Sequence, residues 1–247
     1  MKNISIIFPA YNEAERIGPT LKSFHNYLTA KNVTFEIIVV DDGSTDNTIK
    51  YVESLQQEIP NLIVIPSEKN SGKGHAVRIG MLAAQGNIRL FSDADGSTPV
   101  EEMAKVLEPL VLETADISIG SRYLALSEIA HAQPYFRRVW SRFANRVVQK
   151  ILLPGIVDPH CGFKAFTAEA ATKIFSQCKI DEWSFDLEVL TLARSLHFRI
   201  NEIPVKWAND ERSKGRISHL PREISNLYSI RKRLHKQNKE FTILQAS

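Results

Sequence analysis

The feature that most constrains the fold is a regular alternation, over the first 120 residues, of short β-branched runs with longer amphipathic stretches. The runs have the length of strands, whereas the stretches between them are long enough for crossover helices. Strands that alternate with helices pair in parallel, because each helix returns the chain to the same end of the sheet. The sequence therefore predicts a doubly wound, mostly parallel α/β sheet with helices on both faces.

We expect five strands and four helices in this region. The expected strands are Ile4–Phe8, Glu36–Val40, Leu62–Ile65, Ile88–Phe91 and Ile117–Ile119, and the expected helices are Glu13–Leu28, Asp46–Gln57, Gly72–Gln85 and Pro99–Glu113. After Gly120 the sequence changes to short mixed segments and basic amphipathic stretches. We predict one α/β domain over residues 1–215, with halves 1–120 and 121–215, followed by a basic amphipathic tail over 216–247.

The composition of this 247-residue chain limits its expected cellular compartment and its expected mode of contact with anions and membranes. Its formal net charge is only +3, so attraction to anions must come from local clusters of charge. Two cysteines are too few for a disulfide framework, which favours a reducing, cytoplasmic compartment. The first residues lack a signal-peptide pattern, and no apolar run approaches the roughly 20 residues of a membrane-spanning helix. If the protein meets a membrane, we expect it to lie on the cytoplasmic face.

Two carboxylates follow the apolar run Ile88–Phe91 in the string Asp93-Ala94-Asp95. Ligands of open α/β sheets bind beyond the carboxyl ends of the strands, so both side chains fall at the expected ligand edge. Mg²⁺ and Mn²⁺ prefer oxygen ligands and commonly share carboxylates with diphosphate oxygens. Capping of the next helix is the alternative, but the position after a buried strand favours a metal site.

Two further segments fall at the same expected edge. Asp41 and Asp42 end the second predicted strand, where one carboxylate suits an Asp-Gly turn and the other suits a nucleotide, in either order. The segment Asn70–Gly74 resembles a phosphate-cradling loop at a helix start but lacks the full P-loop spacing. We place Lys73 on the nucleotide side.

These segments together carry a resemblance to a known family. The strings Ile7–Glu13, Val40–Asp46, Asn70–Gly74 and Asp93–Gly96 resemble, in order, the signature of the inverting family 2 glycosyltransferases with the GT-A fold. Further strings are similar to its branch of dolichyl-phosphate glucose and mannose synthases, namely Gly120–Tyr123, Cys161–Phe166, Trp183–Glu188 and Arg212–Lys214.

The resemblance implies roles for individual residues. The nucleotide sugar would be held by Pro9, Ala10, Tyr11, Glu13, Asp42, Lys73, Asp93, Ala94, Asp95, Arg212 and Lys214, with Asp93 and Asp95 as metal ligands. It also implies a nucleotide-sugar donor, a polyprenyl phosphate acceptor and Mg²⁺ or Mn²⁺. The strings at 161–164 and 183–186 look closer to the glucose synthases, which favours UDP-glucose over GDP-mannose.

The acceptor decides how much catalytic machinery is needed. A phosphate acceptor is already anionic, so it needs arginines that position it and no base. We predict Arg122, with Arg137, Arg138 and Arg142, for that task. An alcohol acceptor would need a base, and Asp186 is the secondary candidate for it.

The segment 134–153 predicts an interfacial helix, because aromatic residues alternate with five basic ones and no acid. An ordinary core-facing helix is the alternative. The tail repeats the pattern and would equally suit a homodimer or a membrane-protein partner. Two other functions compete: a soluble transferase that glycosylates a sugar or protein hydroxyl, and a non-catalytic nucleotide-binding module. Nucleic acid is not expected, because the paired carboxylates would repel phosphates unless a metal intervenes.

Overall fold

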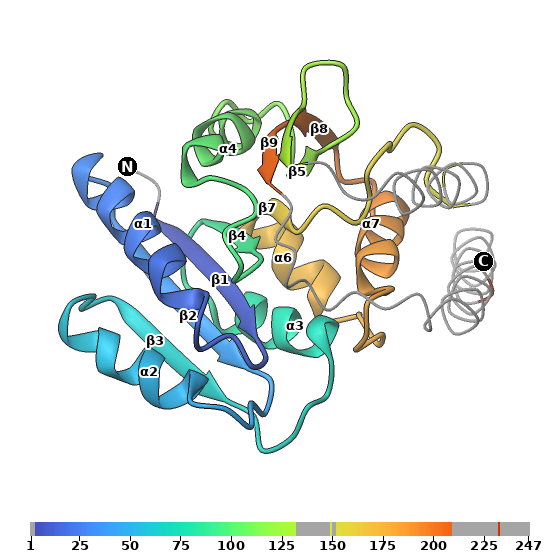
Figure 1. Cartoon of the computed structure of the whole chain (residues 1–247). Coiled ribbons are helices and arrows are strands. Elements are labelled where there is room, and N and C mark those ends of the chain that lie inside the picture. The colour runs from blue at the N-terminus through green and yellow to red at the C-terminus, as the bar shows by residue number, and fades with distance from the viewer. Residues whose placement is uncertain (1–2, 132–148, 150–151, 209–231, 233–247) are drawn as a thin grey trace.

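The computed structural model describes residues 3–131, 149, 152–208 and 232 (Figure 1). Its main sheet has seven strands in the order β3-β2-β1-β4-β7-β5-β8. These strands are β1 (Ile4–Ala10), β2 (Phe35–Asp41), β3 (Leu62–Pro66), β4 (Ile88–Ser92), β5 (Ile117–Ser121), β7 (Phe163–Thr167) and β8 (Ile200–Pro204). A separate pair, β6 (Glu128–His131) and β9 (Lys206–Ala208), forms a small parallel sheet.

The sheet is parallel except at β7, which runs antiparallel to both of its neighbours, β4 and β5. The strand therefore begins at the edge where the parallel strands end, and Phe163 pairs with Ser92 there. All but the last residue of β7 are buried, so the strand joins the two halves of the sheet through the core.

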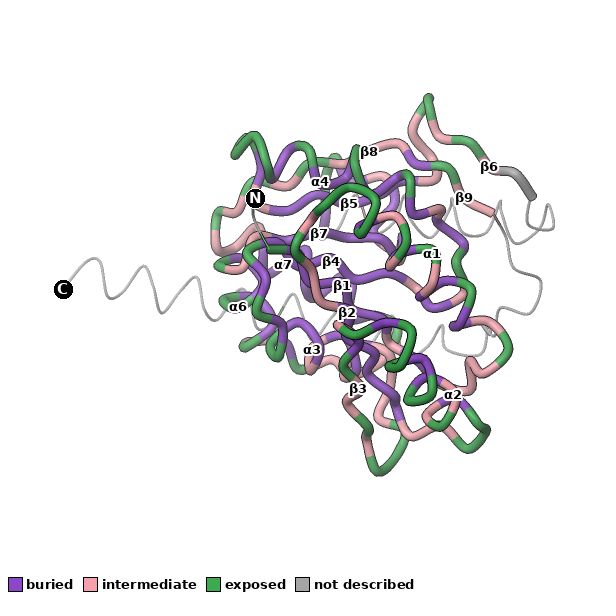
Figure 2. The backbone as a smooth tube through the Cα atoms, turned by 90° about the vertical axis from the view of Figure 1, so that its left-hand side faces the viewer, coloured by how far each residue is buried: buried purple, intermediate pink, exposed green. Residues whose placement is uncertain are grey.

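Helices cover both faces of the sheet (Figure 1). One face packs against α1 (Ile17–Ala30), α2 (Thr48–Ser54) with the 3₁₀ turn η1 (Leu55–Gln57), and α4 (Met103–Val111) with the 3₁₀ turn η2 (Val100–Glu102). The other face packs against α3 (Lys73–Ala83), α6 (Ala168–Phe175) and α7 (Phe185–Ser195). Figure 2 shows the strands as the buried centre, with exposed residues on the helices and in the connections around them. The fold class predicted from the sequence is confirmed.

The predicted elements of the first 120 residues are all present, with shifted ends. Helix α1 begins at Ile17 because Arg16 and Ile17 both donate their amides to the carbonyl of Glu13, which closes a turn ahead of the helix. The stretch 99–113 forms a 3₁₀ turn before α4. The expected helix at 134–153 and the tail at 216–247 fall almost wholly outside the described residues.

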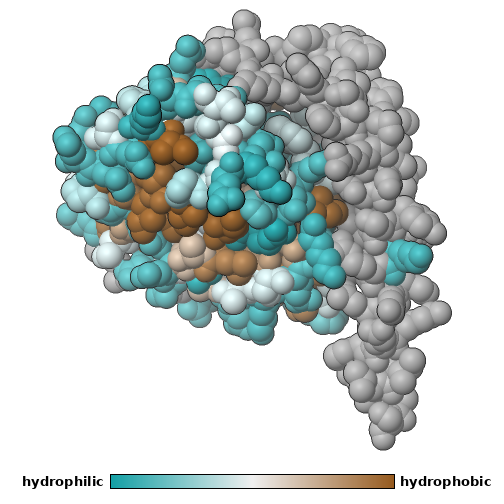
Figure 3. All heavy atoms as spheres, turned by 90° about the horizontal axis from the view of Figure 1, so that it is seen from below, coloured by the Kyte–Doolittle hydropathy of each residue, from teal (hydrophilic) through white to brown (hydrophobic). Residues whose placement is uncertain are grey.

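The described surface includes exposed apolar side chains. Ile63 on β3, Leu82 on α3 and Leu126 in the β5–β6 connection are among them. Figure 3 shows apolar side chains gathered across the middle of the face seen from below, with hydrophilic side chains around them. Among the helices of the described residues, none combines the length and the apolarity needed to cross a bilayer.

Candidate active site

The carboxyl edge of the sheet brings Asp93 against the start of β7. The Asp93 amide donates to the carbonyl of Gly162 at 3.1 Å. A Cβ at Gly162 would overlap the Asp93 carboxylate, so only glycine lets the two segments approach this closely. The antiparallel direction of β7 is what delivers Gly162 to this edge, and it seats Asp93 at the end of β4.

Lys73 lies on the other side of Asp93. Its Nζ is 2.5 Å from Asp93 Oδ1 and 5.1 Å from the ring centroid of Trp183. The lysine side chain is 14% exposed and the aspartate side chain 36%. Burial acts to lower the pKa of Lys73, but the charges of Asp93, Asp186 and Asp95 outweigh it and raise that pKa. The ammonium therefore stays charged at neutral pH and balances the carboxylates beside it.

Asp95 completes a cluster of negative charge after β4. Its Oδ1 accepts from the Ser97 amide at 2.9 Å. Burial, with the charge of Asp93 adding to it, raises the pKa of Asp95 above its usual range. Two partly buried carboxylates that repel each other fit a hard divalent cation, which would relieve both costs.

Across residues 3–131, 149, 152–208 and 232, no three His, Cys, Asp or Glu side chains come together as a metal site. Mg²⁺ commonly binds through one or two carboxylates and keeps water or phosphate oxygens in its shell, and Asp93 and Asp95 would supply two such carboxylates.

The two residues of the Asp41-Asp42 pair bind different parts of the backbone. Asp41 accepts from the Ser44 amide at 2.9 Å and so holds the turn. Both oxygens of Asp42 accept backbone amides, from Ser71 at 2.9 Å and from Gly72 at 2.7 Å. Asp42 thereby fixes the loop that begins α3 and places Lys73. Its contact with a nucleotide stays a prediction.

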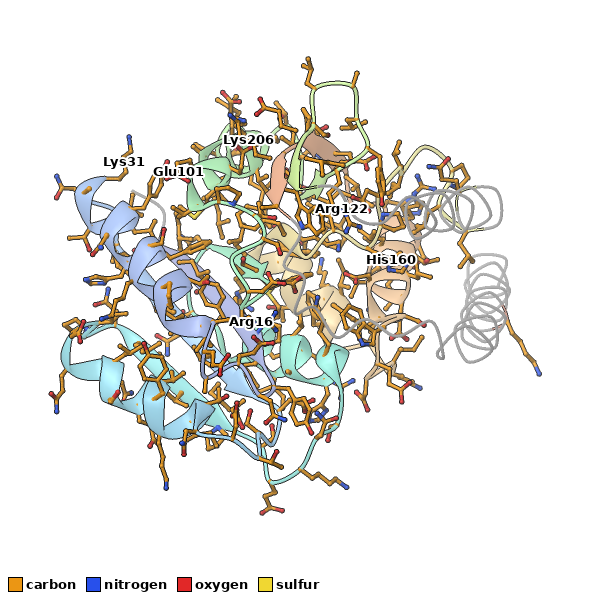
Figure 4. The ribbon with its side chains drawn as sticks, in the orientation of Figure 1. Arg16, Lys31, Glu101, Arg122, His160 and Lys206 are labelled. Atoms are coloured by element: carbon orange, nitrogen blue, oxygen red, sulfur yellow. The ribbon has the colours of Figure 1, made fainter. Side chains whose placement is uncertain are left out.

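The segment after β1 is pinned to the segment after β2. The Asn12 amide donates to Ser44 Oγ at 2.9 Å, and Asn12 Oδ1 accepts from the Thr45 amide at 2.8 Å. Glu13 accepts from the Arg16 guanidinium, which Figure 4 labels near the start of α1. Pro9 and Ala10 end β1, and Tyr11 is 38% exposed beside them. These residues lie together where β1 ends, and Glu13 is bound to Arg16. Their contact with a nucleotide sugar stays a prediction.

Arg122 occupies a second polar cluster, in the half of the chain that follows β5 (Figure 4). Its Nε and Nη2 donate to the two oxygens of Asp158 at 2.7 and 2.8 Å. The rings of Tyr123 and Trp207 lie 5.4 and 5.3 Å from its Cζ. Glu202 accepts the amides of residues 157 and 158 and so holds the aspartate in turn.

The charges of this cluster are strongly coupled. Burial acts to raise the pKa of Asp158, but Arg122 outweighs it and holds that pKa below the usual range. Burial likewise opposes the charge of Arg122, yet Asp158 raises the arginine pKa further. The Arg122 guanidinium is thus oriented and permanently charged, and its Nε and Nη2 groups already donate to Asp158. Its predicted contact with an acceptor phosphate stays a prediction.

Asp186 lies in the interior, in an ion pair with Lys164. Lys164 Nζ is 2.6 Å from Asp186 Oδ1 and 2.5 Å from the Cys161 carbonyl, and the two side chains are 0% and 3% exposed. A carboxylate held by a buried ammonium is poorly placed to remove a proton from an acceptor. The structure therefore gives no support to Asp186 as a general base.

The structure brings some predicted site residues together and leaves others apart. Lys73, Asp93 and Asp95 share one edge, with the buried Ala94 between the aspartates, whereas Arg122 belongs to a separate cluster. Arg137, Arg138, Arg142, Arg212 and Lys214 fall outside the described residues. Our sequence reasoning overlooked Asp158, which carries no motif of its own. It gave no role to Gly162, Lys164 or Trp183, although all three stand in strings that carried the resemblance.

The sequence profile of Glycosyl transferase family 2 matches residues 5–175, which is well over half of the chain. The matched span contains β1 to β5, the loop before α3 and the Asp-Ala-Asp edge. The chain belongs to glycosyl transferase family 2. This glycosyltransferase therefore carries its aspartate cluster within the part that defines the family.

Curated relatives cover most of this glycosyltransferase. It is 35% identical to a dolichyl-phosphate beta-glucosyltransferase of Trichomonas vaginalis, over 92% of this chain and 72% of the relative. The mouse dolichyl-phosphate beta-glucosyltransferase is 37% identical over 86% of this chain and 69% of the relative.

Solved structures share the architecture of this glycosyltransferase at low identity. Mannosyl-3-phosphoglycerate synthase from Rubrobacter xylanophilus superposes with a TM-score of 0.71 at 16% identity, over 96% of this chain and 75% of that one. Glucosyl-3-phosphoglycerate synthase from Mycobacterium tuberculosis, in complex with Mn²⁺, UDP and phosphoglyceric acid, gives 0.69 at 20% identity, over 94% and 78%. These likenesses establish the GT-A glycosyltransferase fold.

Proposed function

We propose that this glycosyltransferase moves glucose from UDP-glucose to a polyprenyl phosphate, with inversion at the anomeric carbon. The observation that carries the proposal is its identity of 35–37% to dolichyl-phosphate beta-glucosyltransferases over most of its length. In the reaction, the bond from the anomeric carbon to the UDP oxygen breaks, and UDP leaves with the electron pair. An oxygen of the acceptor phosphate forms the new bond from the opposite side.

The donor would bind along the carboxyl edge of the sheet. Pro9, Tyr11, Glu13 and Asp42 would hold the base and ribose, while Lys73 would face the diphosphate. Asp93 and Asp95 would hold Mg²⁺ or Mn²⁺, which supplies charge neutralisation to the diphosphate when bound. The paired, partly buried carboxylates described above support this assignment. Arg212 and Lys214 would close over the diphosphate.

The acceptor would be positioned and not deprotonated. A phosphate monoester is already ionised at neutral pH, so the enzyme needs a fixed cation and no general base. Arg122 suits this task because Asp158, Tyr123 and Trp207 hold its guanidinium in place. The burial of Asp186 against Lys164 agrees with a reaction that requires no base.

The polyprenyl acceptor also requires contact with a lipid surface. We propose that the part of the segment 134–153 that precedes Leu152, which includes Arg137, Arg138 and Arg142, lies on an anionic leaflet at the cytoplasmic face. The described end of the segment is not part of that surface, because Leu153 is fully buried in the core. Each Lys or Arg near such a surface contributes about 1 kcal/mol. The protein should therefore co-sediment with anionic liposomes at low salt and be released by high salt. Gln substitution of these arginines together with Arg146 should weaken binding more, per charge removed, than Gln substitution of Lys22, Lys31 and Lys50. Equal losses per charge from the two sets would argue against this surface.

The central test is a panel of radiolabelled nucleotide sugars incubated with short-chain polyprenyl phosphate and Mg²⁺, followed by lipid extraction. We expect label in the lipid phase from UDP-glucose, a β-linked product, and loss of transfer in chelator. Stronger transfer from GDP-mannose would show that the donor is GDP-mannose, and an α-linked product would contradict the inverting mechanism. Transfer to sugar or protein hydroxyls but not to the lipid phosphate would show that the acceptor is a hydroxyl group.

A further inference from the structure

The ammonium of Lys73 has two candidate partners, and it cannot form a full ion pair with both at the same time. In the structure its ammonium forms an ion pair with Asp93, at 2.5 Å. In the proposed function, which this inference builds on, the same ammonium faces the donor diphosphate and Asp93 faces a divalent cation. An ammonium and a divalent cation repel each other strongly when they share one carboxylate in a partly buried site.

The position of Lys73 is fixed by the fold around it. The Asp42 carboxylate holds the amides of Ser71 and Gly72 at 2.9 and 2.7 Å, immediately before the lysine. Gly72 has a φ of +110° and packs against the carbonyl of Asp181, a close approach that leaves no room for a side chain. The backbone of Lys73 is therefore rigidly placed, and only its flexible side chain has freedom to change partner.

The surroundings of the ammonium favour such a change. Trp183, which is 45% exposed, lies under the lysine Nζ at 5.1 Å and gives it an aromatic face beside Asp93. Asp93 lies against Gly162, where a Cβ would overlap its carboxylate. The aspartate side chain is short, whereas the long lysine side chain can move its ammonium to another partner while its backbone stays in place.

We propose that Lys73 acts as a built-in cation that occupies Asp93 until the metal and the nucleotide diphosphate arrive together. Without nucleotide, the lysine neutralises the carboxylate and opposes cation binding. The diphosphate then attracts the ammonium away from Asp93 and contributes oxygen ligands of its own. Metal and nucleotide therefore bind cooperatively, and the lysine is the residue that couples them.

The coupling can be measured without any transfer reaction. Free Mn²⁺ is followed by electron paramagnetic resonance while the full chain is titrated, with and without UDP. For the wild type we expect weak Mn²⁺ binding alone and an increase with UDP of roughly 5–150-fold, the usual range of coupling between two ligands. In Lys73→Met, Mn²⁺ affinity without UDP should rise at least about tenfold, while the enhancement by UDP should shrink.

Two variants serve as controls for this titration. Lys69→Met removes the same charge from an exposed position on the same loop and should leave both affinities near the wild-type values. Lys73→Arg keeps the charge and should retain the weak binding without UDP. Circular dichroism of each variant confirms that the chain is folded.

The possible outcomes are distinct. Mn²⁺ affinity without UDP that is unchanged or lower in Lys73→Met overturns the inference, as does an equal rise in Lys69→Met. A wild type whose Mn²⁺ binding ignores UDP altogether contradicts the proposed donor site itself.

Discussion

Two lysine–aspartate pairs of nearly equal length differ greatly in their exposure to solvent. Lys73 and Asp93 are 2.5 Å apart at the ligand edge, with side chains 14% and 36% exposed. Lys164 and Asp186 are 2.6 Å apart in the core, with side chains 0% and 3% exposed. Removing one member of a buried pair leaves an uncompensated charge in a low dielectric, whereas water stabilises the survivor of an accessible pair. Exposure, and not distance, distinguishes an exchangeable pair from a structural one.

Breaking the buried pair, Lys164 with Asp186, should have the largest effect on stability. Lys164→Met leaves Asp186 charged and unpartnered in the core, and we expect it to lower the free energy of unfolding by about 3–5 kcal/mol. Urea denaturation measures this. The double variant Lys164→Met with Asp186→Leu removes both charges and should recover much of the loss, because apolar replacements of buried pairs are often neutral. A loss under about 1 kcal/mol in the single variant would place this pair in the accessible class.

The pair between Arg122 and Asp158 should rank next and should affect the acceptor. Arg122→Ala removes a charge-assisted contact worth roughly 1.5–3 kcal/mol, so acceptor affinity and turnover should fall sharply while donor affinity changes little. The double variant with Asp158→Ala removes the stranded carboxylate. It should regain stability without regaining acceptor affinity. Normal acceptor kinetics in either folded variant would restrict Arg122 to a structural role.

Substitution of Asp95 should have opposite effects on stability and on activity. Its raised pKa means that its stabilising contribution is complete below the unfolded-state pKa and is lost as pH rises through the folded-state pKa. At neutral pH its charge therefore costs stability. Asp95→Asn should raise metal-free stability by about 0.5–2 kcal/mol at pH 7 and abolish transfer. Thermal unfolding at pH 7 and pH 3.5 should show that the gain shrinks in acid. A variant that retained transfer would remove Asp95 from the site.

Breaking the more exposed pair, Lys73 with Asp93, should have the smallest effect on stability. Lys73→Met is the same substitution as Lys164→Met, made at the other lysine, so the two variants compare the pairs directly. We expect Lys73→Met to change the free energy of unfolding by less than about 1 kcal/mol, because the partly exposed Asp93 regains hydration. Urea denaturation of both variants in one buffer tests the ranking. Equal losses would mean that burial does not separate the two pairs.

The sequence predicted the parallel half of the fold well. β-Branched runs such as Ile37–Val40 mark strands by composition, and amphipathic stretches between them mark crossovers, so both signals are local. The position of Asp93 and Asp95 at the end of β4 was predictable for the same reason, because a place directly after a buried strand is visible in the chain. The residues of Asn70–Gly74 also fall where the sequence placed them, at the start of α3.

The partners of the charged residues were not predictable in the same way. Arg122 and Asp158 lie 36 positions apart, and Lys164 and Asp186 lie 22 apart. Such contacts depend on how strands are ordered in the sheet, and a five-residue mixed segment such as Phe163–Thr167 carries no local signal for its direction. The order of roles within Asp41-Asp42 likewise required the loop of residues 70–72 to be placed in space.

The reversed direction of β7 has a consequence for engineering. The strand lies between β4 and β5 and presents Gly162 to Asp93, so the part of the chain that follows Gly120 supplies a wall of the edge that carries Asp93. A fragment ending near residue 120 would expose the apolar flank of β4 as an open edge, which invites aggregation. Chimeras between relatives should therefore be joined after Thr167, so that β7, Gly162 and Asp93 are inherited as one unit together with Arg122.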